Sequence, residues 1–153
     1  MPTGFLVSLR MVVGLFFVVV SAEKLVHPYQ NFLYVVQSYQ VFPPFLEEVI
    51  ARTIPWAEFF LGLFLVLGLW LGVVLRSFII LLAGFIIIVS QALIRQLPLD
   101  DCGCFGGLIK LPLWGTGMLD IGLLIFLIVL VRREKDTAAV SLDKLLPTNE
   151  KDQ

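Results

Sequence analysis

The chain has 153 residues, a length that suits one domain, and 59% of them are hydrophobic against only 15% that are charged. Soluble domains usually hold about 45 to 50% hydrophobic residues, so this composition excludes an ordinary soluble globule and indicates a protein surrounded by the lipid bilayer. The 11 Lys and Arg against 12 Asp and Glu, a net charge of -1, provide no basic surface for phosphate backbones and exclude a nucleic-acid-binding protein.

Four apolar stretches have the length of a membrane-spanning helix, which is about 20 residues for a hydrocarbon core of about 30 Å. They lie at residues 5–22, 53–71, 73–94 and 113–131. No alternating ten-residue pattern indicates a β-barrel, and backbone groups in lipid must bond within their own segment, so each stretch is predicted to be a helix. We therefore expect an all-α integral membrane four-helix bundle within residues 1–131, followed by a polar cytoplasmic tail at 132–153.

The first span has a second interpretation as a signal peptide. Arg10, the apolar run at 11–20 and the small residues Ser21 and Ala22 imitate the three regions of such a peptide. The apolar character begins earlier, at Phe5, which favours a retained membrane helix.

Between the first two spans, residues 28–42 carry Phe32, Val35, Val36 and Tyr39 at helical spacing. This pattern predicts a short amphipathic helix on the outer membrane surface. An ordinary loop packed over the bundle fits the same residues, and the pattern leaves both interpretations open.

Lys and Arg near the span ends predict the orientation. Six lie on the side of both termini and four on the other side: Arg10, Arg76, Arg132, Arg133, Lys135 and Lys144 against Lys24, Arg52, Arg95 and Lys110. Since cytoplasmic loops carry the excess of basic residues, we expect both termini in the cytoplasm and both long loops outside. Arg10 lies near enough to its helix end to extend its charge to the membrane surface.

The second outer loop holds the most unusual residues, Cys102 and Cys104 on either side of Gly103. Gly103 lets the backbone adopt the strained dihedrals that a disulfide between such close cysteines needs. A strained, exposed disulfide exchanges readily with other thiols, and the outer compartment is oxidising. The adjacent Asp100 and Asp101 oppose this reactivity, because negative charge disfavours the thiolate. The pair therefore predicts a thiol exchange site, with a bridge that only pins the loop as the alternative.

A metal site is the weaker interpretation of these cysteines. Two thiolates and the single histidine, His27, fall short of the four ligands of a zinc site. Copper(I) binds through two thiolates, so a copper site stays open, although we predict no metal. No Walker or Rossmann motif for nucleotide binding appears. Quinone is expected as a cofactor only through the family resemblance described below.

Five ionisable residues lie near the outer ends of the spans, on the side of the cysteines. They are Glu23, Lys24, Glu58, Arg95 and Asp120. Carboxylates within a span are costly to ionise in lipid, so Glu58 and Asp120 are predicted to face the bundle interior and share a cation, which we expect to be Lys24. Together with Arg95, which closes the third span, these three residues form a charged cluster that supports the cysteine site. An ion pair that joins helices and a proton-handling site fit these residues equally.

Three motifs together resemble the DoxX superfamily of membrane proteins. The first two helices of that superfamily resemble SAEKL at 21–25 and IPWAE at 54–58. The loop CGCFG at 102–106, followed by Asp120 in the fourth span, narrows the resemblance to the MauE branch, the methylamine-utilisation membrane proteins. The similarity covers nearly all of residues 5–131.

The resemblance implies a bacterial inner-membrane protein that supports maturation of a periplasmic redox enzyme, such as methylamine dehydrogenase, by thiol–disulfide exchange. The family's motif positions carry over to Lys24, Glu58, Cys102 and Cys104. A periplasmic thioredoxin-like or other redox protein is the partner that this implies, and the resemblance leaves open whether the chain is itself a thiol–disulfide oxidoreductase. Two alternatives remain: a non-catalytic subunit or assembly factor of a larger redox complex, and a quinone-linked oxidoreductase subunit of the DoxD type.

Overall fold

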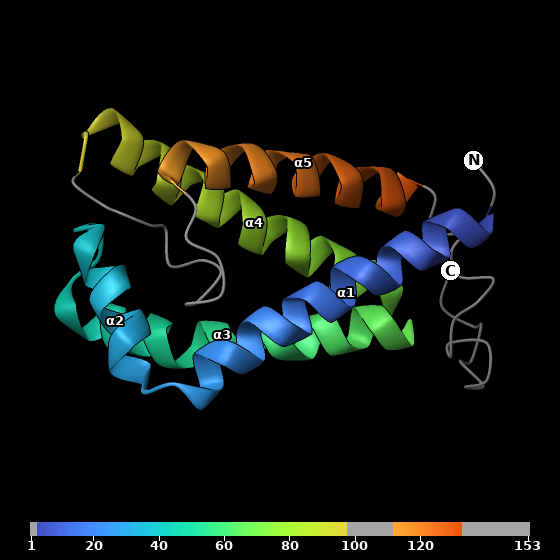
Figure 1. Ribbon diagram of the computed structural model, residues 1–153, viewed down its shortest axis with the longest axis horizontal. Coiled ribbons are helices and arrows are strands. Elements are labelled where there is room, and N and C mark those ends of the chain that lie inside the picture. The colour runs from blue at the N-terminus through green and yellow to red at the C-terminus, as the bar shows by residue number, and fades with distance from the viewer. Residues whose placement is uncertain (1–2, 98–111, 133–153) are drawn as a thin grey trace, which may run out of the picture.

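The computed structural model describes residues 3–97 and 112–132, and every structural statement below concerns these residues. They form five helices: α1 Thr3–Val26, α2 Tyr29–Ser38, α3 Pro44–Leu67, α4 Leu71–Ile94 and α5 Leu113–Arg132 (Figure 1). All but α2 are long and apolar enough to cross a membrane. The all-helical architecture with four candidate spans, predicted from the apolar stretches, is confirmed.

The four long helices associate as two pairs, α1 with α3 and α4 with α5. In Figure 1 the two pairs meet near the end where the chain begins and diverge toward the end that carries α2. Buried residues of all four helices form the main core where the pairs meet, and Phe17 of α1 lies 4.7 Å from Phe78 of α4 between ring centroids. The short α2 packs mainly against α3 and closes the diverging end.

Two glycines bring α1 and α3 into close contact. A Cβ atom added at Gly14 would lie 2.8 Å from Val66 Cγ2 and 3.0 Å from the carbonyl oxygen of Gly62. A Cβ atom at Gly62 would in turn lie 3.0 Å from the carbonyl oxygen of Gly14. Only residues without a side chain allow the two backbones to approach this closely, as is common between helices in membranes.

The variant Gly14→Ala should therefore lower the free energy of unfolding by about 1 to 3 kcal/mol, the usual cost of overpacking. Gly122→Ala is the matched control, because Gly122 is exposed on α5 and its added Cβ would meet no described atom within 4 Å. Titration of both purified variants with SDS in mixed micelles measures the difference. Equal unfolding midpoints would contradict the close contact between α1 and α3.

The second span begins earlier than hydropathy predicts. Helix α3 starts at Pro44, not at residue 53, and contains the charged residues that hydropathy excluded. Glu48 and Arg52 form an exposed pair one turn apart, with Nη2 and Oε1 2.6 Å from each other, while Glu47 is buried. Proline at the first helical position starts the helix, because its fixed φ suits that position and its missing N–H is not needed there.

The turn between α3 and α4 also differs from the prediction. Gly68, with a φ of 70°, ends α3, whereas Gly72, the predicted connection, lies inside α4. A left-handed residue is the common way to end a helix, and glycine adopts that conformation without steric cost. The prediction was wrong because the apolar residues continue through the turn and hide it.

The amphipathic helix predicted within residues 28–42 is present as α2, so the alternative of an ordinary loop is wrong. Phe32 and Val36 are buried against α3, while Tyr34 is 73% exposed on the opposite face. Its place on the outer side of a membrane stays a prediction.

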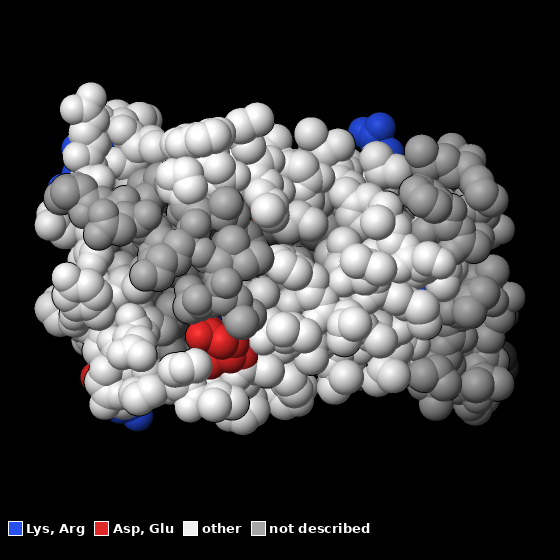
Figure 2. Space-filling model, in the orientation of Figure 1, with Lys and Arg blue, Asp and Glu red and all other residues white. Residues whose placement is uncertain are grey.

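The surface along the helices is mostly uncharged on the face drawn in Figure 2. On the face drawn in Figure 2, uncharged atoms cover most of the length of the helices, one group of Asp or Glu atoms interrupts them, and the Lys and Arg atoms lie toward the two ends. Large apolar side chains such as Ile80 and Ile87 are exposed on α4. Such a surface suits contact with lipid and would be unfavourable in water.

Arg10 does not extend to the surface as expected. It is only 1% exposed and lies on α1 among the residues that form the main core. The prediction considered only the distance from the helix end, whereas the packing of neighbouring helices encloses this side chain.

Candidate functional site

A buried ion pair joins α1 to α3 near the end of the bundle that carries α2. Lys24 Nζ donates a hydrogen bond to Glu58 Oε2 at 2.9 Å, and the two side chains are 1% and 2% exposed. The pairing predicted for these two residues is therefore present. Helical side chains lean toward the N-terminus of their own helix, and α1 and α3 run in opposite directions. Lys24 lies near the end of α1 and Glu58 lies deeper, within α3, so the two side chains lean toward each other.

An aromatic ring of α2 covers this pair. The Lys24 Nζ atom lies 4.9 Å from the centroid of the Phe32 ring, which is close enough for a cation–π interaction. Phe32 is itself buried against α3. The ammonium group thus has a carboxylate and a ring face as partners, and α2 is anchored directly above the pair.

Ser21 is a buried polar residue on α1. It lies one turn before Lys24 on α1, is fully buried, and donates its hydroxyl hydrogen to the Phe17 carbonyl oxygen at 2.6 Å. Because this bond lies within α1, the hydroxyl is satisfied without reaching between the helices.

Such a pair is weak evidence for stability. The attraction between two buried charges is largely offset by the cost of removing both from water, and apolar residues of similar size often stabilise as well. Removing one partner is much more costly, because it leaves the other charge buried and uncompensated. Stability alone therefore does not account for the pair, which makes it a candidate functional feature.

The other two members of the predicted cluster, Asp120 and Arg95, differ in burial. Asp120 is 3% exposed on α5, one turn after the buried Thr116, so this face of α5 points inward as expected. Its approach to Lys24 and Glu58 stays a prediction. Arg95 is exposed at the end of α4 and donates to the Gln40 backbone carbonyl at 3.3 Å and to Gln40 Oε1 at 3.5 Å.

Arg95 therefore bonds at the surface of the bundle, whereas Lys24 and Glu58 are buried. It joins the end of α4 to the segment after α2, because residue 95 already lies beyond the last turn of α4. Sequence reasoning also missed the ring of Phe32, which it assigned only to an apolar helix face. An aromatic residue on the buried face of a helix that follows a span-end lysine is the signal that could have indicated this contact.

Cys102 and Cys104 lie outside the described residues. The helices on either side of their segment are described: α4 ends and α5 begins at the end of the bundle that carries α2 (Figure 1). Leu97, five residues before Cys102 in the sequence, packs against Tyr39 and Ala92. Phe32 contacts Lys24, and Tyr39 contacts Leu97, which lies just before the segment that contains the cysteines, residues 98–111. The two aromatic residues are seven positions apart, roughly 10 Å along a helix, so one short segment makes both contacts.

Within residues 3–97 and 112–132, no three His, Cys, Asp or Glu side chains gather as metal ligands. The hypothesis of a copper(I) site concerns Cys102 and Cys104, which lie outside this part of the chain.

Comparison with known proteins places this arrangement in a family. No curated protein and no solved structure matches the chain. A family model described as methylamine utilisation protein MauE matches residues 3–133, which include all five helices, the Lys24–Glu58 pair and both cysteines. Because the match covers most of its length, the chain belongs to the MauE family of methylamine-utilisation membrane proteins.

Proposed function

We propose that this protein serves methylamine utilisation by exchanging thiols and disulfides, through Cys102 and Cys104, with a redox protein in the periplasm. The observation that supports the proposal is the buried Lys24–Glu58 pair beneath α2, at the end of the bundle to which the Cys-Gly-Cys segment is attached. A bundle built only for anchoring would not need a charged pair there, since apolar residues would pack as well.

The proposed exchange moves two electrons from the thiols of a partner enzyme to the Cys102–Cys104 disulfide, and an oxidised thioredoxin-like protein is their next acceptor. A thiolate of a maturing periplasmic enzyme, such as methylamine dehydrogenase, attacks one sulfur of the Cys102–Cys104 disulfide and forms a mixed disulfide. The enzyme's second thiol then displaces this chain, which is left with two thiols and the two protons, while the enzyme gains a disulfide. In a second exchange, an oxidised thioredoxin-like protein takes up the two electrons and two protons, is itself reduced to two thiols, and restores the Cys102–Cys104 disulfide.

Lys24 and Glu58 act in this proposal as positioning residues. Their bond sets how α1 and α3 sit against each other, and the Phe32 ring above Lys24 sets the place of α2. Helix α2 in turn packs beside Leu97, where the cysteine segment begins. The pair thus supports the surface at which a partner would meet the cysteines.

The variants Cys102→Ser and Cys104→Ser test the proposal directly. In intact cells, one of the two variants should accumulate a mixed disulfide with a periplasmic protein. The second thiol, which would otherwise attack and release the mixed disulfide, is absent. Alkylation of intact cells followed by non-reducing gels detects the adduct, and mass spectrometry identifies its partner. The double Cys→Ser variant is the control, and an adduct that persists in it, or its absence from both single variants, would contradict the proposal.

The exchange also requires the cysteines to face the periplasm. After reduction, Cys102 and Cys104 should react with a membrane-impermeant maleimide added to intact spheroplasts. The expectation rests on the basic residues near the span ends, six on the side of the termini against four. Labelling that begins only when the membrane is broken would reverse the orientation and remove the oxidising environment from the proposal.

A second candidate function is that of a membrane subunit or assembly factor that docks a larger redox complex. Its support is the apolar surface near α2, where Val26, Tyr34 and Phe45 are 83%, 73% and 70% exposed. Exposed apolar groups of this size commonly mark contact with a protein or with lipid. This function predicts that both cysteines are dispensable, so the double variant Cys102→Ser with Cys104→Ser should keep full function.

A further inference from the structure

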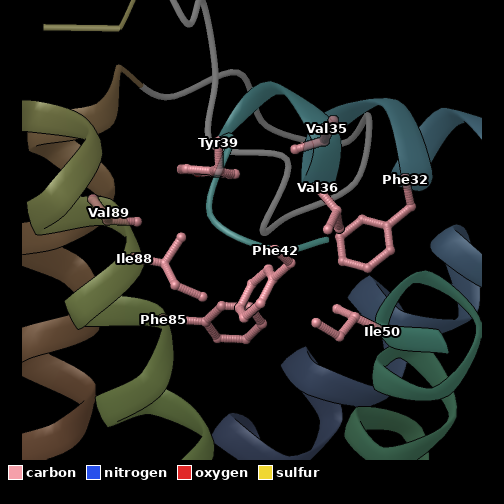
Figure 3. A pocket seen from close by; sticks show the side chains of 9 residues that line it. All are labelled: Phe32, Val35, Val36, Tyr39, Phe42, Ile50, Phe85, Ile88 and Val89. Carbon is pink, nitrogen blue, oxygen red and sulfur yellow. The ribbon is translucent and has the colours of Figure 1, made fainter. Parts of the chain in front are cut away.

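An apolar groove runs between α3 and α4 beneath α2. Its inner part is a cavity of about 40 Å³ under α2, and Figure 3 shows side chains of α2, α3 and α4 around it. It continues into a more open groove of about 460 Å³ along α4. The two parts share four lining residues: Phe42, Ile50, Phe85 and Ile88.

The lining of this groove suits a hydrocarbon chain. Ser77 and the hydroxyl-bearing Tyr39 are the polar side chains among the residues that line it, and the rest are aliphatic or aromatic. At Gly84 the groove is wide, because an added Cβ would meet no described atom within 4 Å. The neighbouring Ile80 is 73% exposed, so the groove opens on the side of the bundle that contacts lipid.

The length of the groove matches one leaflet of a bilayer. Its lining extends along α4 from Ser77 to Val89, a separation of twelve residue positions, which is roughly 18 Å in a helix. Half of a hydrocarbon core is roughly 15 Å thick. A single lipid tail that enters beneath α2 would therefore reach the middle of the bilayer.

A cation lies at the end of the groove nearest α2. Arg95 is exposed at the end of α4 and bonds to Gln40, which directly follows the lining residue Tyr39. The guanidinium group presents several N–H donors in a planar fork that matches phosphate oxygens. A positive group at the membrane end of a hydrocarbon groove is complementary to the phosphate and tail of one phospholipid.

We propose that this protein binds one phospholipid, from the leaflet on the α2 side, with a tail in the groove between α3 and α4 and its phosphate at Arg95. The bound tail fills the space between helix pairs that diverge toward α2, and the phosphate stabilises the contact between α4 and the segment after α2. This site is independent of the proposed thiol exchange.

Native mass spectrometry of the full chain in detergent, titrated with dioleoylphosphatidylglycerol, tests the site. The protein should retain one phospholipid after the detergent-bound lipids are stripped. Gly84→Leu should lower retention at least about tenfold, because the new side chain occupies the groove that the tail needs. Gly122→Leu, at an equally open glycine on α5 outside the groove, should leave retention unchanged.

Arg95→Gln tests the phosphate contact without altering the core, since Arg95 is exposed. It should weaken retention about tenfold, the effect of losing one charged hydrogen bond. Arg76→Gln, an exposed arginine at the other end of α4, should have no effect. Equal retention by Gly84→Leu and Gly122→Leu, a retained quinone, or a dimer that Gly84→Leu abolishes would each overturn the proposal.

Discussion

Replacing Lys24 by methionine should lower the free energy of unfolding by about 3 to 5 kcal/mol, the usual loss when one partner of a buried ion pair is removed. The Glu58 carboxylate would then lie 2% exposed without the ammonium group that now lies 2.9 Å away. The cation–π contact with Phe32 would be lost as well. Titration of the purified protein with SDS in mixed micelles measures the change.

The exposed pair of Arg52 and Glu48 is the matched control for Lys24→Met. Its two side chains are 60% and 51% exposed although Nη2 and Oε1 are only 2.6 Å apart. Arg52→Met should have a small effect, because water and salt screen an exposed pair. A loss for Lys24→Met no larger than that for Arg52→Met would contradict the buried pair.

A double variant, Lys24→Met with Glu58→Leu, separates stability from chemistry. Apolar replacement of both partners is often neutral or stabilising, so the double variant should recover most of the stability that Lys24→Met loses. If maturation of the periplasmic enzyme recovers together with stability, the ion pair acts only by positioning α1, α2 and α3. Maturation that stays low in a stable double variant would instead favour a proton-handling role for Lys24 or Glu58.

The second large effect concerns the double variant Cys102→Ser with Cys104→Ser. We expect maturation of the periplasmic partner to be abolished while the protein still inserts and accumulates, because both cysteines lie outside the four spans that form the fold. Quantitative immunoblots of membranes measure abundance, and free-thiol counts on the purified partner measure its disulfides.

Three outcomes of this experiment are distinct. Loss of maturation at normal abundance supports thiol exchange. Loss of abundance, with maturation falling in proportion, means that the cysteines only pin the loop. Full maturation at normal abundance ends the exchange hypothesis and supports the docking subunit, whose apolar surface near α2 contains no cysteine among the described residues.

The helix boundaries show where sequence patterns stop being informative. Hydropathy located α1, α4 and α5 closely, because their spans are nearly free of charge. It placed the start of α3 nine residues too late, since Glu47, Glu48 and Arg52 lower the local hydropathy. Side-chain pairing and burial within the fold offset those charges, and a hydropathy average contains neither.

The charged residues show the same division. The depth of Glu58 in its span made a cationic partner necessary, and Lys24 was the nearest candidate. The exclusion of Arg95 from that cluster and the enclosure of Arg10 depended on how the helices rotate and cross. Rotation about the helix axis decides which side chains point inward, and the apolar faces of membrane helices define it poorly because lipid is as apolar as the core.

The sequence by itself determined that this protein is an all-helical membrane protein of four spans with a cysteine pair in one loop and a buried carboxylate that needs a cation. These features follow from local composition, since lipid forces each apolar stretch to satisfy its backbone as a helix. Only the tertiary structure decided that Phe32 covers Lys24, that Gly14 and Gly62 join α1 to α3, and that a groove opens between α3 and α4. Those contacts join residues far apart in the chain, and they depend on the shapes of side chains packed together, which no local pattern contains.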